Sequence, residues 1–428
     1  MNLLEELRWR GMVQDMMPGT EEQLQKEMTT AYIGFDPTAD SLHIGNLVPI
    51  LLLVHLQKAG HKPIALVGGA TGMVGDPSGK SEERNLLSED VLQKNIAGQK
   101  KQLQQYLDFD ASKPNAAEMA NNYDWFANFT FLDFIRDVGK HISVNYMMAK
   151  ESVKKRLDGE NGMSFTEFTY QLVQGYDFYY LNKHKNCKLQ MGGSDQWGNI
   201  VTGTELIRKK GGTEAFAFTC PLITKSDGSK FGKSEKGNVW LDPEKTSPYE
   251  FYQFWLNTSD EDAAKYIKIF TFLPQAEINE LIEKHDGNQY KRELQKKLAE
   301  EVTAFVHGKE CLQLALSATD LLFSKDTMQM VSAMSKDHLD ATLKGVPAIE
   351  LHETQLQSQP DIVSFLTETA IFSSKGEAKK MILGGGISLN KQKVSDQSAK
   401  VELSMFINNK YLFVQKGKTN YYLVKIIE

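Results

Sequence analysis

The chain has 428 residues, of which 41% are hydrophobic and 24% charged, the balance of a soluble globular protein. This length exceeds one ordinary core, so two to four domains are expected. The longest apolar run, Leu47 to Val54, is too short to cross a bilayer, which takes ~20 residues, and residues 1–8 predict an amphipathic helix rather than a secretion signal. Three scattered cysteines (Cys187, Cys220, Cys311) predict neither a disulfide framework nor a zinc-ligand pair. The expectation is a protein of the reducing cytoplasm that does not act at a membrane.

The net charge of −6 is unevenly distributed along the chain. From Ser373 to the C-terminus there are ten lysines against four acidic residues, so this end carries +6 and the rest about −12. The acidic average argues weakly against a nucleic-acid partner, whereas the split indicates a basic module attached to an acidic body. A solvated charged face is an equally good explanation of the lysines alone.

The first predicted elements form a strand–helix–strand unit. Residues 30–35 predict a strand, 42–59 a buried helix with Asp40 and Ser41 as candidate N-caps, and 62–68 a second strand. Such a unit implies a parallel sheet with a right-handed crossover. Ligands of parallel sheets lie beyond the carboxyl ends of the strands, so the loops that follow the two strands are the places to inspect.

The same pattern returns later in the chain. Residues 188–191 predict a strand, 196–210 a helix and 216–223 another strand. Between the two halves, residues 85–180 predict a mostly helical insertion rich in aromatic residues, which we expect in the core or at a subunit interface.

Two residues of the first loop suit phosphate. His43 and Asn46 are three positions apart in the first turn of the predicted helix, so both side chains project from one face. A helix start already favours an anion, and Gly45 allows close approach of a base or ribose. A His-x-x-Asn pattern alone is nevertheless common by chance.

The second loop is rich in glycine but is not a P-loop. The glycine that a P-loop requires five residues before Gly79 is Val74 here. Asp76 suits a substrate amine, and Lys80 and Arg84 suit phosphates. A charged surface turn is the alternative interpretation.

The third loop, residues 225–234, follows a predicted strand. Lys230 and Lys233 lie three apart, with a glycine before the second lysine and the hydroxyl of Ser234 after it, a pattern that suits a mobile clamp on a polyphosphate. For a single K-x-x-K pattern, an ordinary polar loop remains the more common explanation.

A predicted helix at 165–182 carries a polar stripe. Tyr170, Gln174 and Asp177 lie at i, i+4 and i+7 and therefore share one face. The stripe predicts the wall of a polar pocket, with a solvated face as the alternative.

Together these elements resemble the class I aminoacyl-tRNA synthetases, and within them the tyrosyl family. The blocks that carry the resemblance are YIGFDPTADSLHIGN, GGATGMVGDPSGK, TYQLVQGYD, GGSDQWGNI and KFGKS. The stretch IFSSKGEAKKMILGGGISLNKQKV resembles the S4 RNA-binding domain of bacterial tyrosyl enzymes. Two positions depart from the general motifs: Asn46 replaces the second histidine of HIGH, and KFGKS stands for KMSKS.

The resemblance implies an α/β fold with a Rossmann-like parallel-sheet catalytic domain, an α-helical domain and a small α+β S4-like RNA-binding domain. The implied parts are a catalytic domain with a helical dimer-interface insertion (1–225), a KFGKS loop linker (226–247), a helical anticodon-binding domain (248–340), a linker (341–360) and the S4-like domain (361–428).

The resemblance also assigns roles within one site. Tyr32 and Asp177 are expected to hydrogen-bond the phenol of L-tyrosine. The residues expected at its ammonium group are Tyr170, Gln174 and Asp76, with Gln196 near the carboxylate. Those expected at adenosine and ribose are Gly34, Asp36, Gly193 and Asp195, and those around the triphosphate are Thr38, His43, Asn46, Lys80, Arg84, Lys230, Lys233 and Ser234.

The implied reaction is activation of tyrosine with ATP, followed by transfer to the terminal ribose of tRNA(Tyr). The substrate carboxylate attacks directly, so positioning and placed charge carry the catalysis, and Mg²⁺ arrives with ATP rather than in a protein-held site. A homodimer contact is expected near 123–147, and the lysines expected to contact tRNA are Lys375, Lys379, Lys380, Lys391 and Lys393. The alternatives are a tryptophanyl-tRNA synthetase, a non-catalytic RNA-binding protein and a metabolic nucleotidyltransferase.

Overall fold

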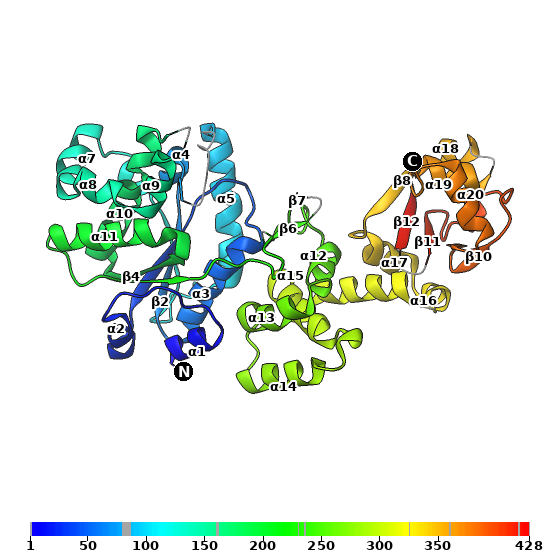
Figure 1. The fold of residues 1–428 in the computed structure, drawn as a ribbon, viewed down its shortest axis with the longest axis horizontal. Helices are drawn as coiled ribbons and strands as arrows, with labels where there is room; N and C mark the ends of the chain where they lie inside the picture. The colour runs from blue at the N-terminus through cyan, green and yellow to red at the C-terminus, as the bar shows by residue number, and fades with distance from the viewer. Residues whose placement is uncertain are drawn as a thin grey trace. The chain divides into compact units, whose positions relative to one another are not determined.

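The computed structural model divides the chain into two compact units, each with its own five-stranded sheet (Figure 1). One unit comprises Met1–Asp242 and Thr258–Leu298, and the other Pro243–Asn257 and Ala299–Glu428. The structure describes residues 2–78, 87–159, 162–229, 231–234, 237–324, 326–358, 361–417 and 420–427.

The first unit contains a parallel sheet of strand order β3-β2-β1-β4-β5. Its strands are β1 (Thr30–Phe35), β2 (Lys62–Val67), β3 (Glu118–Asn121), β4 (Cys187–Gly193) and β5 (Phe216–Cys220). The two predicted strand–helix–strand units are confirmed, and so is the Rossmann-like fold. The chain builds outward from β1 in one direction and then from β4 in the other, so the strand order reverses between β1 and β4. Ligands of such sheets bind at this reversal.

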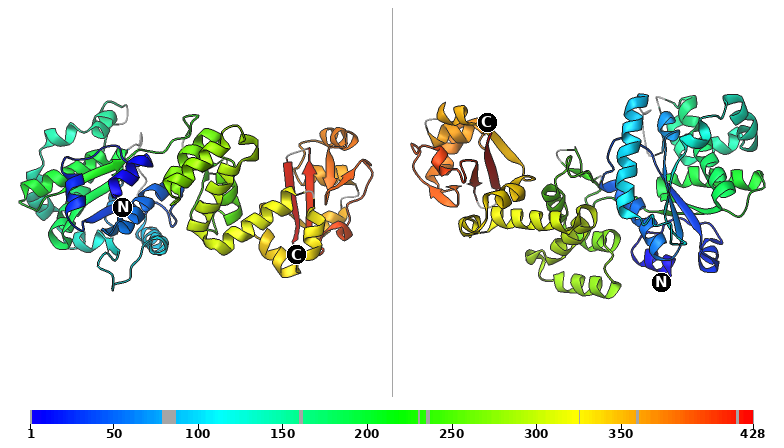
Figure 2. Two further views of the ribbon diagram at one scale, coloured as in Figure 1. Left: turned by 90° about the horizontal axis from the view of Figure 1, so that it is seen from below. Right: turned by 180° about the vertical axis from the view of Figure 1, so that it is seen from behind.

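Helices cover both faces of this sheet. In Figures 1 and 2, α3 (Leu47–Lys58) and α5 (Glu89–Tyr106) lie on one side, and α10 (Phe165–Lys185) and α11 (Trp197–Lys209) on the other. Helix α3 is buried along most of its length, which explains its nearly continuous apolar sequence. The shorter helices of this part are α1 (Leu3–Trp9), α2 (Thr20–Lys26), η1 (Ile44–Asn46), α4 (Thr71–Val74), α6 (Tyr123–Phe126), α7 (Phe131–Asp137), η2 (Gly139–His141), α8 (Val144–Met148), α9 (Glu151–Leu157) and η3 (Ser194–Gln196).

The predicted N-terminal amphipathic helix is confirmed as α1. The Asn2 side chain caps it by accepting from the Leu4 amide at 3.1 Å. Leu3, Leu4 and Leu7 are buried.

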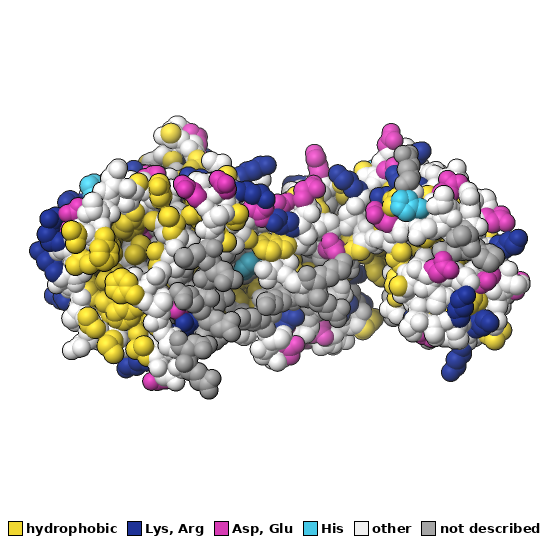
Figure 3. Space-filling view, turned by 90° about the horizontal axis from the view of Figure 1, so that it is seen from above, with side chains coloured by type: hydrophobic (Ala, Val, Ile, Leu, Met, Phe, Trp, Pro, Cys, Tyr) yellow, Lys and Arg dark blue, Asp and Glu magenta, His cyan; other side chains and the backbone are white. Residues whose placement is uncertain are grey.

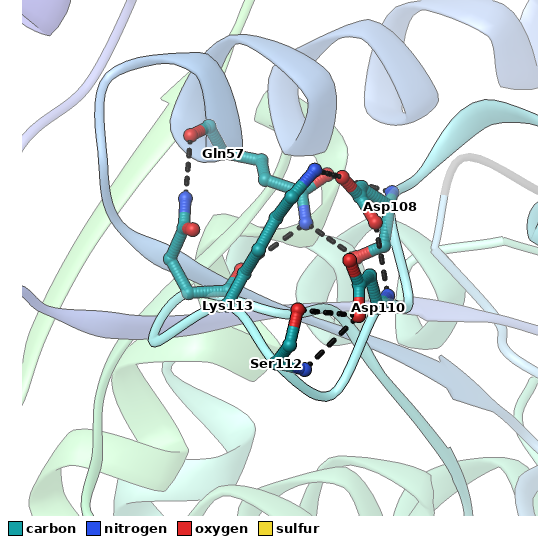
Figure 4. A network of polar contacts seen from close by, with 6 residues as sticks. Gln57, Asp108, Asp110, Ser112 and Lys113 are labelled. Carbon is teal, nitrogen blue, oxygen red and sulfur yellow. Dashed lines mark hydrogen bonds and ion pairs between the residues drawn. The ribbon is translucent and has the colours of Figure 1, made fainter.

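Strand β3 was not expected, because the insertion was predicted as mostly helical. The loop between α5 and β3 is tied to the end of α3 through Gln57 (Figure 4). The Gln57 amide donates to the Asp108 carbonyl at 2.7 Å and accepts from the Asp108 amide at 2.9 Å. Lys113 pairs with the Asp108 carboxylate, and Asp110 accepts from the Ser112 hydroxyl at 2.7 Å. These bonds fix the loop that delivers β3 to the sheet edge.

The helical region after the first sheet is shared between the two units, whereas the sequence predicted one helical domain over 248–340. Helix α12 (Pro248–Leu256) belongs to the second unit, and α13 (Asp260–Phe270), α14 (Gln275–His285) and η4 (Gln289–Lys291) belong to the first. Helix α15 (Glu293–Phe323) is kinked at Gly308, whose φ of 85° favours glycine.

The second unit contains a mixed sheet of order β10-β9-β11-β12-β8. Its strands are β8 (Ala348–His352), β9 (Ile387–Leu389), β10 (Gln392–Val394), β11 (Tyr411–Lys416) and β12 (Asn420–Ile427). Its remaining helices are α16 (Thr327–Ala333), α17 (Lys336–Leu343), α18 (Glu353–Ser358), α19 (Ile362–Glu368), α20 (Lys375–Leu383) and η5 (Leu403–Met405). The predicted α+β character of the C-terminal domain is confirmed.

The predicted linker at 341–360 is wrong. This stretch holds the end of α17, strand β8 and α18, and β8 pairs in parallel with β12. Leu351 of β8 is buried in the same core as Val424 of β12. The C-terminal sheet therefore begins before residue 361.

Within the described ranges, no helix combines the length and the apolar character that a membrane crossing requires.

Candidate active site

A cavity of about 550 Å³ lies at the carboxyl ends of β1 and β4, where the strand order reverses. It draws its walls from both strands, from α10 and from the loops after β2 and β5. Thirteen of the predicted site residues line this one cavity: Tyr32, Gly34, Asp36, Thr38, His43, Asn46, Asp76, Tyr170, Gln174, Asp177, Gly193, Asp195 and Gln196.

The deep end of the cavity is formed by Tyr32 of β1 and Asp177 of α10, each 1% exposed. The Tyr32 hydroxyl has no hydrogen-bond partner among the described residues. The Asp177 carboxylate accepts from the Trp125 indole at 2.9 Å and from the Asn122 amide at 3.0 Å. Burial nevertheless raises the pKa of Asp177 to about 8. A buried hydroxyl and a buried carboxyl group at one end of a cavity suit a ligand that carries its own hydroxyl.

Asn122 and Trp125, which donate to Asp177, were not among the predicted site residues. They directly follow β3, and their segment was interpreted only as core or interface. Asn122 also accepts from the Ala70 amide at 2.6 Å and donates to the Thr71 hydroxyl at 3.1 Å, so it joins the loop after β2 to Asp177. The available signal was their place after a strand, but a strand of four residues escaped prediction.

Gln190 of β4 was also missed. Its side chain is 2% exposed, lines the cavity and has a carbonyl oxygen without a hydrogen-bond partner in the described part of the chain. The alternation of a buried strand does not distinguish this polar residue from a structural one.

The polar stripe of α10 faces the cavity, as predicted. The Tyr170 hydroxyl donates to Asp36 at 2.9 Å, and the Thr71 hydroxyl donates to the other oxygen of Asp36 at 2.8 Å. Burial, followed by the nearby Asp36 charge, raises the pKa of Tyr170 well above its usual value. The structure thus joins Asp36, expected near the nucleotide, to Tyr170, expected near the amino acid.

A second group of acceptors centres on Asp76. Its carboxylate accepts from the Gln196 amide at 2.7 Å and from the Ser78 backbone at 2.9 Å. Burial and the Asp76 charge raise the pKa of Asp195. The buried Gln174 carbonyl oxygen has no partner in the described ranges. Several acceptors close together in one cavity suit a ligand ammonium group.

His43 and Asn46 occupy the start of the helical segment that leads into α3, but they cap it themselves. His43 Nδ1 accepts from the Gly45 amide at 3.0 Å, and Asn46 Oδ1 accepts from the His43 amide at 3.0 Å. The prediction that Asp40 or Ser41 is the N-cap is wrong. A neutral His43 ring that accepts at Nδ1 carries its proton on Nε2, and the Asn46 amide keeps its NH₂ group for other acceptors. Both residues can therefore donate to an anion while holding the turn.

The cationic side chains of the predicted clamp are not placed by the structure. Lys80, Arg84 and Lys230 lie outside the described residues. For Lys233 and Ser234 only the backbone is described, which forms β6 (Lys233–Ser234) opposite β7 (Gly237–Asn238). Their contact with a polyphosphate stays a prediction.

Comparison with known proteins places this geometry in a family. A model described as "tRNA synthetases class I (W and Y)" matches residues 24–324. The chain belongs to this family, the class I tRNA synthetases of the tryptophan and tyrosine group. A second model, described as "Tyrosine--tRNA ligase SYY-like C-terminal domain", matches residues 338–424, a range that includes β8.

Relatives match over the full length. A tyrosine–tRNA ligase of Bacteroides fragilis is 60% identical over 427 residues, which cover 99% of each chain. One of Flavobacterium johnsoniae is 58% identical over 430 residues, with all of each chain covered. A solved C-terminally truncated mitochondrial tyrosyl-tRNA synthetase of Aspergillus nidulans has a TM-score of 0.65 and 30% identity, over 78% of this chain and 94% of that one. A tryptophanyl-tRNA synthetase of Plasmodium falciparum shares the fold at a TM-score of 0.50 and 13% identity, over 79% of this chain and 87% of that one.

The C-terminal lysines of this class I synthetase differ in their surroundings. Lys379, Lys380 and Lys393 are exposed. Lys375 is also exposed and donates to the Ser364 hydroxyl at 3.2 Å. Lys391 instead donates to a backbone carbonyl of α15 at 2.8 Å, lies 4.2 Å from the Tyr421 ring, and has a pKa lowered by burial. Its position indicates a structural contact rather than a lysine held out for a phosphate.

In the described part of this synthetase, no three His, Cys, Asp or Glu side chains are grouped so as to hold a metal ion.

The raised pKa of Asp177 predicts a pH-dependent stability. Between its ordinary value of 3.8 and about 8, the folded protein keeps the carboxyl protonated while the unfolded chain ionises it. The folded state then binds more protons, so this group makes the free energy of unfolding fall as pH rises, by up to about 1.4 kcal/mol per pH unit. Asp177→Asn removes that contribution. Urea unfolding at pH 5, 6.5 and 8 should show that the free energy of unfolding of the variant increases relative to that of the wild type as pH rises. A difference between the two free energies that does not change with pH would contradict the raised pKa of Asp177.

Proposed function

We propose that this protein is a tyrosine–tRNA ligase. It activates L-tyrosine with ATP to tyrosyl-adenylate and pyrophosphate, and transfers the tyrosyl group to the terminal ribose of tRNA(Tyr). The observation that carries the choice of amino acid is the pair of Tyr32 and Asp177 at the deep end of the cavity. The tryptophanyl structure shows that the fold is shared between the two specificities, so the side chains must decide. The full-length relatives named tyrosine–tRNA ligase support the same choice.

Tyrosine fits the cavity with its phenol at the deep end. The phenol donates to Asp177 and accepts from the Tyr32 hydroxyl, which otherwise has no partner in the described ranges. The ammonium group lies among Tyr170, Gln174 and Asp76, and the carboxylate near Gln196. This placement aims the carboxylate toward the side of the cavity that holds the HIGN turn.

Activation needs no protein nucleophile or general base. A carboxylate oxygen of tyrosine forms a bond to the α-phosphorus, and the bond from that phosphorus to the pyrophosphate oxygen breaks. The protein contributes orientation and donors where negative charge develops. The His43 Nε2–H and the Asn46 amide face this demand from the turn, and Lys230 and Lys233 serve it from the KFGKS loop.

The remaining ATP contacts follow the same orientation. Gly34, Gly193 and Asp195 lie toward adenosine and ribose, with Asp36 close by. Thr38, Lys80, Arg84 and Ser234 serve the phosphates. Mg²⁺ rides on the triphosphate as part of the substrate.

In the second step, a hydroxyl of the terminal ribose of tRNA attacks the tyrosyl carbonyl and AMP leaves. Exposed lysines of the C-terminal domain, such as Lys379, Lys380 and Lys393, supply phosphate contacts with the tRNA. We place the enzyme in the cytoplasm, where its tRNA is found. Charging of total tRNA with each labelled amino acid tests the proposal. Charging with tryptophan in place of tyrosine would contradict the assignment as a tyrosine–tRNA ligase.

Removing the C-terminal domain separates the two steps. Because β8 belongs to the C-terminal sheet, the truncation removes residues 335–428 rather than 361–428. The truncated protein should keep tyrosine-dependent pyrophosphate exchange within about threefold and lose tRNA charging by about a hundredfold or more, since phosphate contacts dominate nucleic-acid affinity. Equal loss of both activities would contradict a tRNA-binding role of this domain.

We further propose that two copies form a homodimer through the helical insertion. Apolar side chains are exposed on α7 and α8, namely Phe131, Leu132, Ile135, Val144 and Met148. Figure 3 shows hydrophobic side chains gathered on the part of the molecule that carries these helices. An exposed patch of this kind marks an interaction site. Leu132→Asp should shift sedimentation at micromolar concentration from dimer to monomer, and a wild-type monomer would contradict the dimer.

A further inference from the structure

The KFGKS loop is seated on helix α13. Asp262 of α13 is buried and accepts from the Ser226 amide at 3.0 Å. Tyr266, one turn further along α13, donates from its hydroxyl to the Thr224 carbonyl at 3.3 Å. The backbone that leads into the loop is thus bound to side chains of one helix.

An aromatic residue of the loop also packs against α13. The Phe231 ring is stacked on Phe270, with centroids 5.2 Å apart and planes at 21°, and meets Tyr266 edge-on at 5.1 Å. Tyr266 and Phe270 are both 1% exposed. These are arrangements that aromatic rings prefer. We call Tyr266 and Phe270 the aromatic socket.

Immediately after Phe231, the chain passes against the HIGN turn. Gly232 has a φ of +86°, and a Cβ there would lie 3.3 Å from Ile44 Cγ1. The Gly232 carbonyl accepts from the Val239 amide at 3.1 Å, and the Val239 carbonyl accepts from the Ile44 amide at 2.9 Å. The position of Phe231 therefore decides where the chain runs past the turn that holds His43.

The socket is itself held in place from the N-terminus. Arg10 is buried, and its guanidinium donates to the carbonyls of Thr271 at 2.7 Å and Leu273 at 2.8 Å, just after α13 ends. It also donates to the Lys268 carbonyl at 2.5 Å. Fixing the end of α13 fixes Phe270, and with it one wall of the socket.

We propose that Phe231 is a positioning residue for the activation step, and that the aromatic socket of α13 sets the register of the KFGKS loop. Lys230 and Lys233 flank Phe231 in the sequence. The socket therefore determines the backbone positions from which both lysine side chains extend. The proposal rests on the proposed function, because it assigns those lysines to the ATP phosphates. Without the Phe231 ring, the loop keeps its lysines but is no longer anchored to α13. Misplaced lysines lower the rate of activation and leave the affinity for tyrosine unchanged.

The test compares four variants of the full-length protein. Phe231→Ala empties the socket, and Phe231→Met refills it with a long apolar side chain, the residue of the KMSKS form of the motif. Tyr266→Phe keeps the ring but removes the hydroxyl bond to Thr224. Tyr290→Ala is the control, because Tyr290 is an aromatic residue of the same unit that is 80% exposed.

Phe231→Ala should lower kcat for tyrosine-dependent pyrophosphate exchange by about tenfold to a hundredfold, with the tyrosine dissociation constant and the thermal midpoint nearly unchanged. Phe231→Met should recover most of the loss, Tyr266→Phe should lose a few-fold, and Tyr290→Ala should match the wild type. An unchanged kcat in Phe231→Ala, or an equal loss of tyrosine affinity, would overturn the positioning role.

A second readout does not depend on activity. Without substrates, trypsin should cleave after Lys225 faster in Phe231→Ala than in the wild type or Tyr290→Ala, as followed by mass spectrometry. Equal cleavage rates would contradict the claim that Phe231 anchors the loop on α13. If the proposed function fails instead, wild-type exchange with tyrosine is absent while the difference in cleavage persists.

Discussion

Asp177→Asn is expected to lower the preference of this enzyme for tyrosine over phenylalanine by about one to two orders of magnitude. Losing a buried hydrogen bond so that its partner is left unsatisfied costs about 1–3 kcal/mol, so kcat/KM for tyrosine should fall by about 5–150-fold. Activation of phenylalanine, which has no hydroxyl to offer, should change little. A site built to bind a hydroxyl rejects an analogue that lacks it by about 10⁴–10⁵, and tyrosyl-tRNA synthetases are the usual example of this effect.

The reason lies in the contacts of Asp177. Its carboxylate already accepts from Trp125 and Asn122, and those bonds aim it at the deep end of the cavity beside Tyr32. An amide at this position presents a donor to one of these donors, so the side chain cannot serve the phenol in the same way.

Asp76→Asn is the matched control for this prediction. It changes a carboxylate of the same cavity that we assign to the ammonium group, which tyrosine and phenylalanine share. It should therefore lower kcat/KM for both amino acids and leave their ratio unchanged. Pyrophosphate exchange with tyrosine and with phenylalanine gives kcat/KM for the wild type, Asp177→Asn and Asp76→Asn. If Asp177→Asn keeps the wild-type ratio of the two kcat/KM values, the assignment of Asp177 to the phenol is wrong.

Lys233→Ala is expected to slow the activation step by about 10²–10³-fold with little change in tyrosine affinity. An amine that contacts the phosphates mainly as charge develops stabilises the transition state more than the bound substrates. Single-turnover formation of tyrosyl-adenylate, together with equilibrium binding of tyrosine, separates the two effects.

Lys225→Ala is the control, because Lys225 is a lysine of the same loop outside the K-x-x-K pattern. Its replacement keeps the backbone bond between the Lys225 amide and Ser229 and should leave the rate of activation unchanged. If Lys233→Ala activates tyrosine within threefold of the wild type, the clamp role is wrong.

Much of the catalytic domain could be predicted from local sequence pattern. The strands at 30–35 and 62–67 are short apolar runs on either side of a long buried helix, and this pattern determines a parallel unit by itself. The stripe of Tyr170, Gln174 and Asp177 was predictable because helical period alone puts these three side chains on one face.

The parts that escaped prediction depend on contacts distant in sequence. Strand β3 has four residues and forms only because β2 lies beside it. Its position brings Asn122 and Trp125 to Asp177, so missing the strand meant missing both residues. Strand β8 lies in a polar stretch and is a strand only through β12, more than 70 residues away.

The prediction of the helix N-cap failed for a different reason. Asp and Ser are common caps, and both precede the helix, but the chain starts its helical turn later. The Asp40 carboxylate pairs with Lys94 at 3.1 Å instead, and the Ser41 hydroxyl donates to the Leu42 carbonyl at 2.8 Å. Only the three-dimensional path shows that His43 carries the cap and a predicted catalytic role together.

Amino-acid-dependent pyrophosphate exchange by the purified wild-type protein is the most direct test of tyrosine as its substrate. Tyrosine, tryptophan and phenylalanine should be compared at equal concentrations with ATP and Mg²⁺. We expect rapid exchange with tyrosine and, for tryptophan and phenylalanine, rates lower by several orders of magnitude. Exchange with tryptophan equal to or faster than that with tyrosine would contradict the assignment of Tyr32 and Asp177 to a substrate phenol.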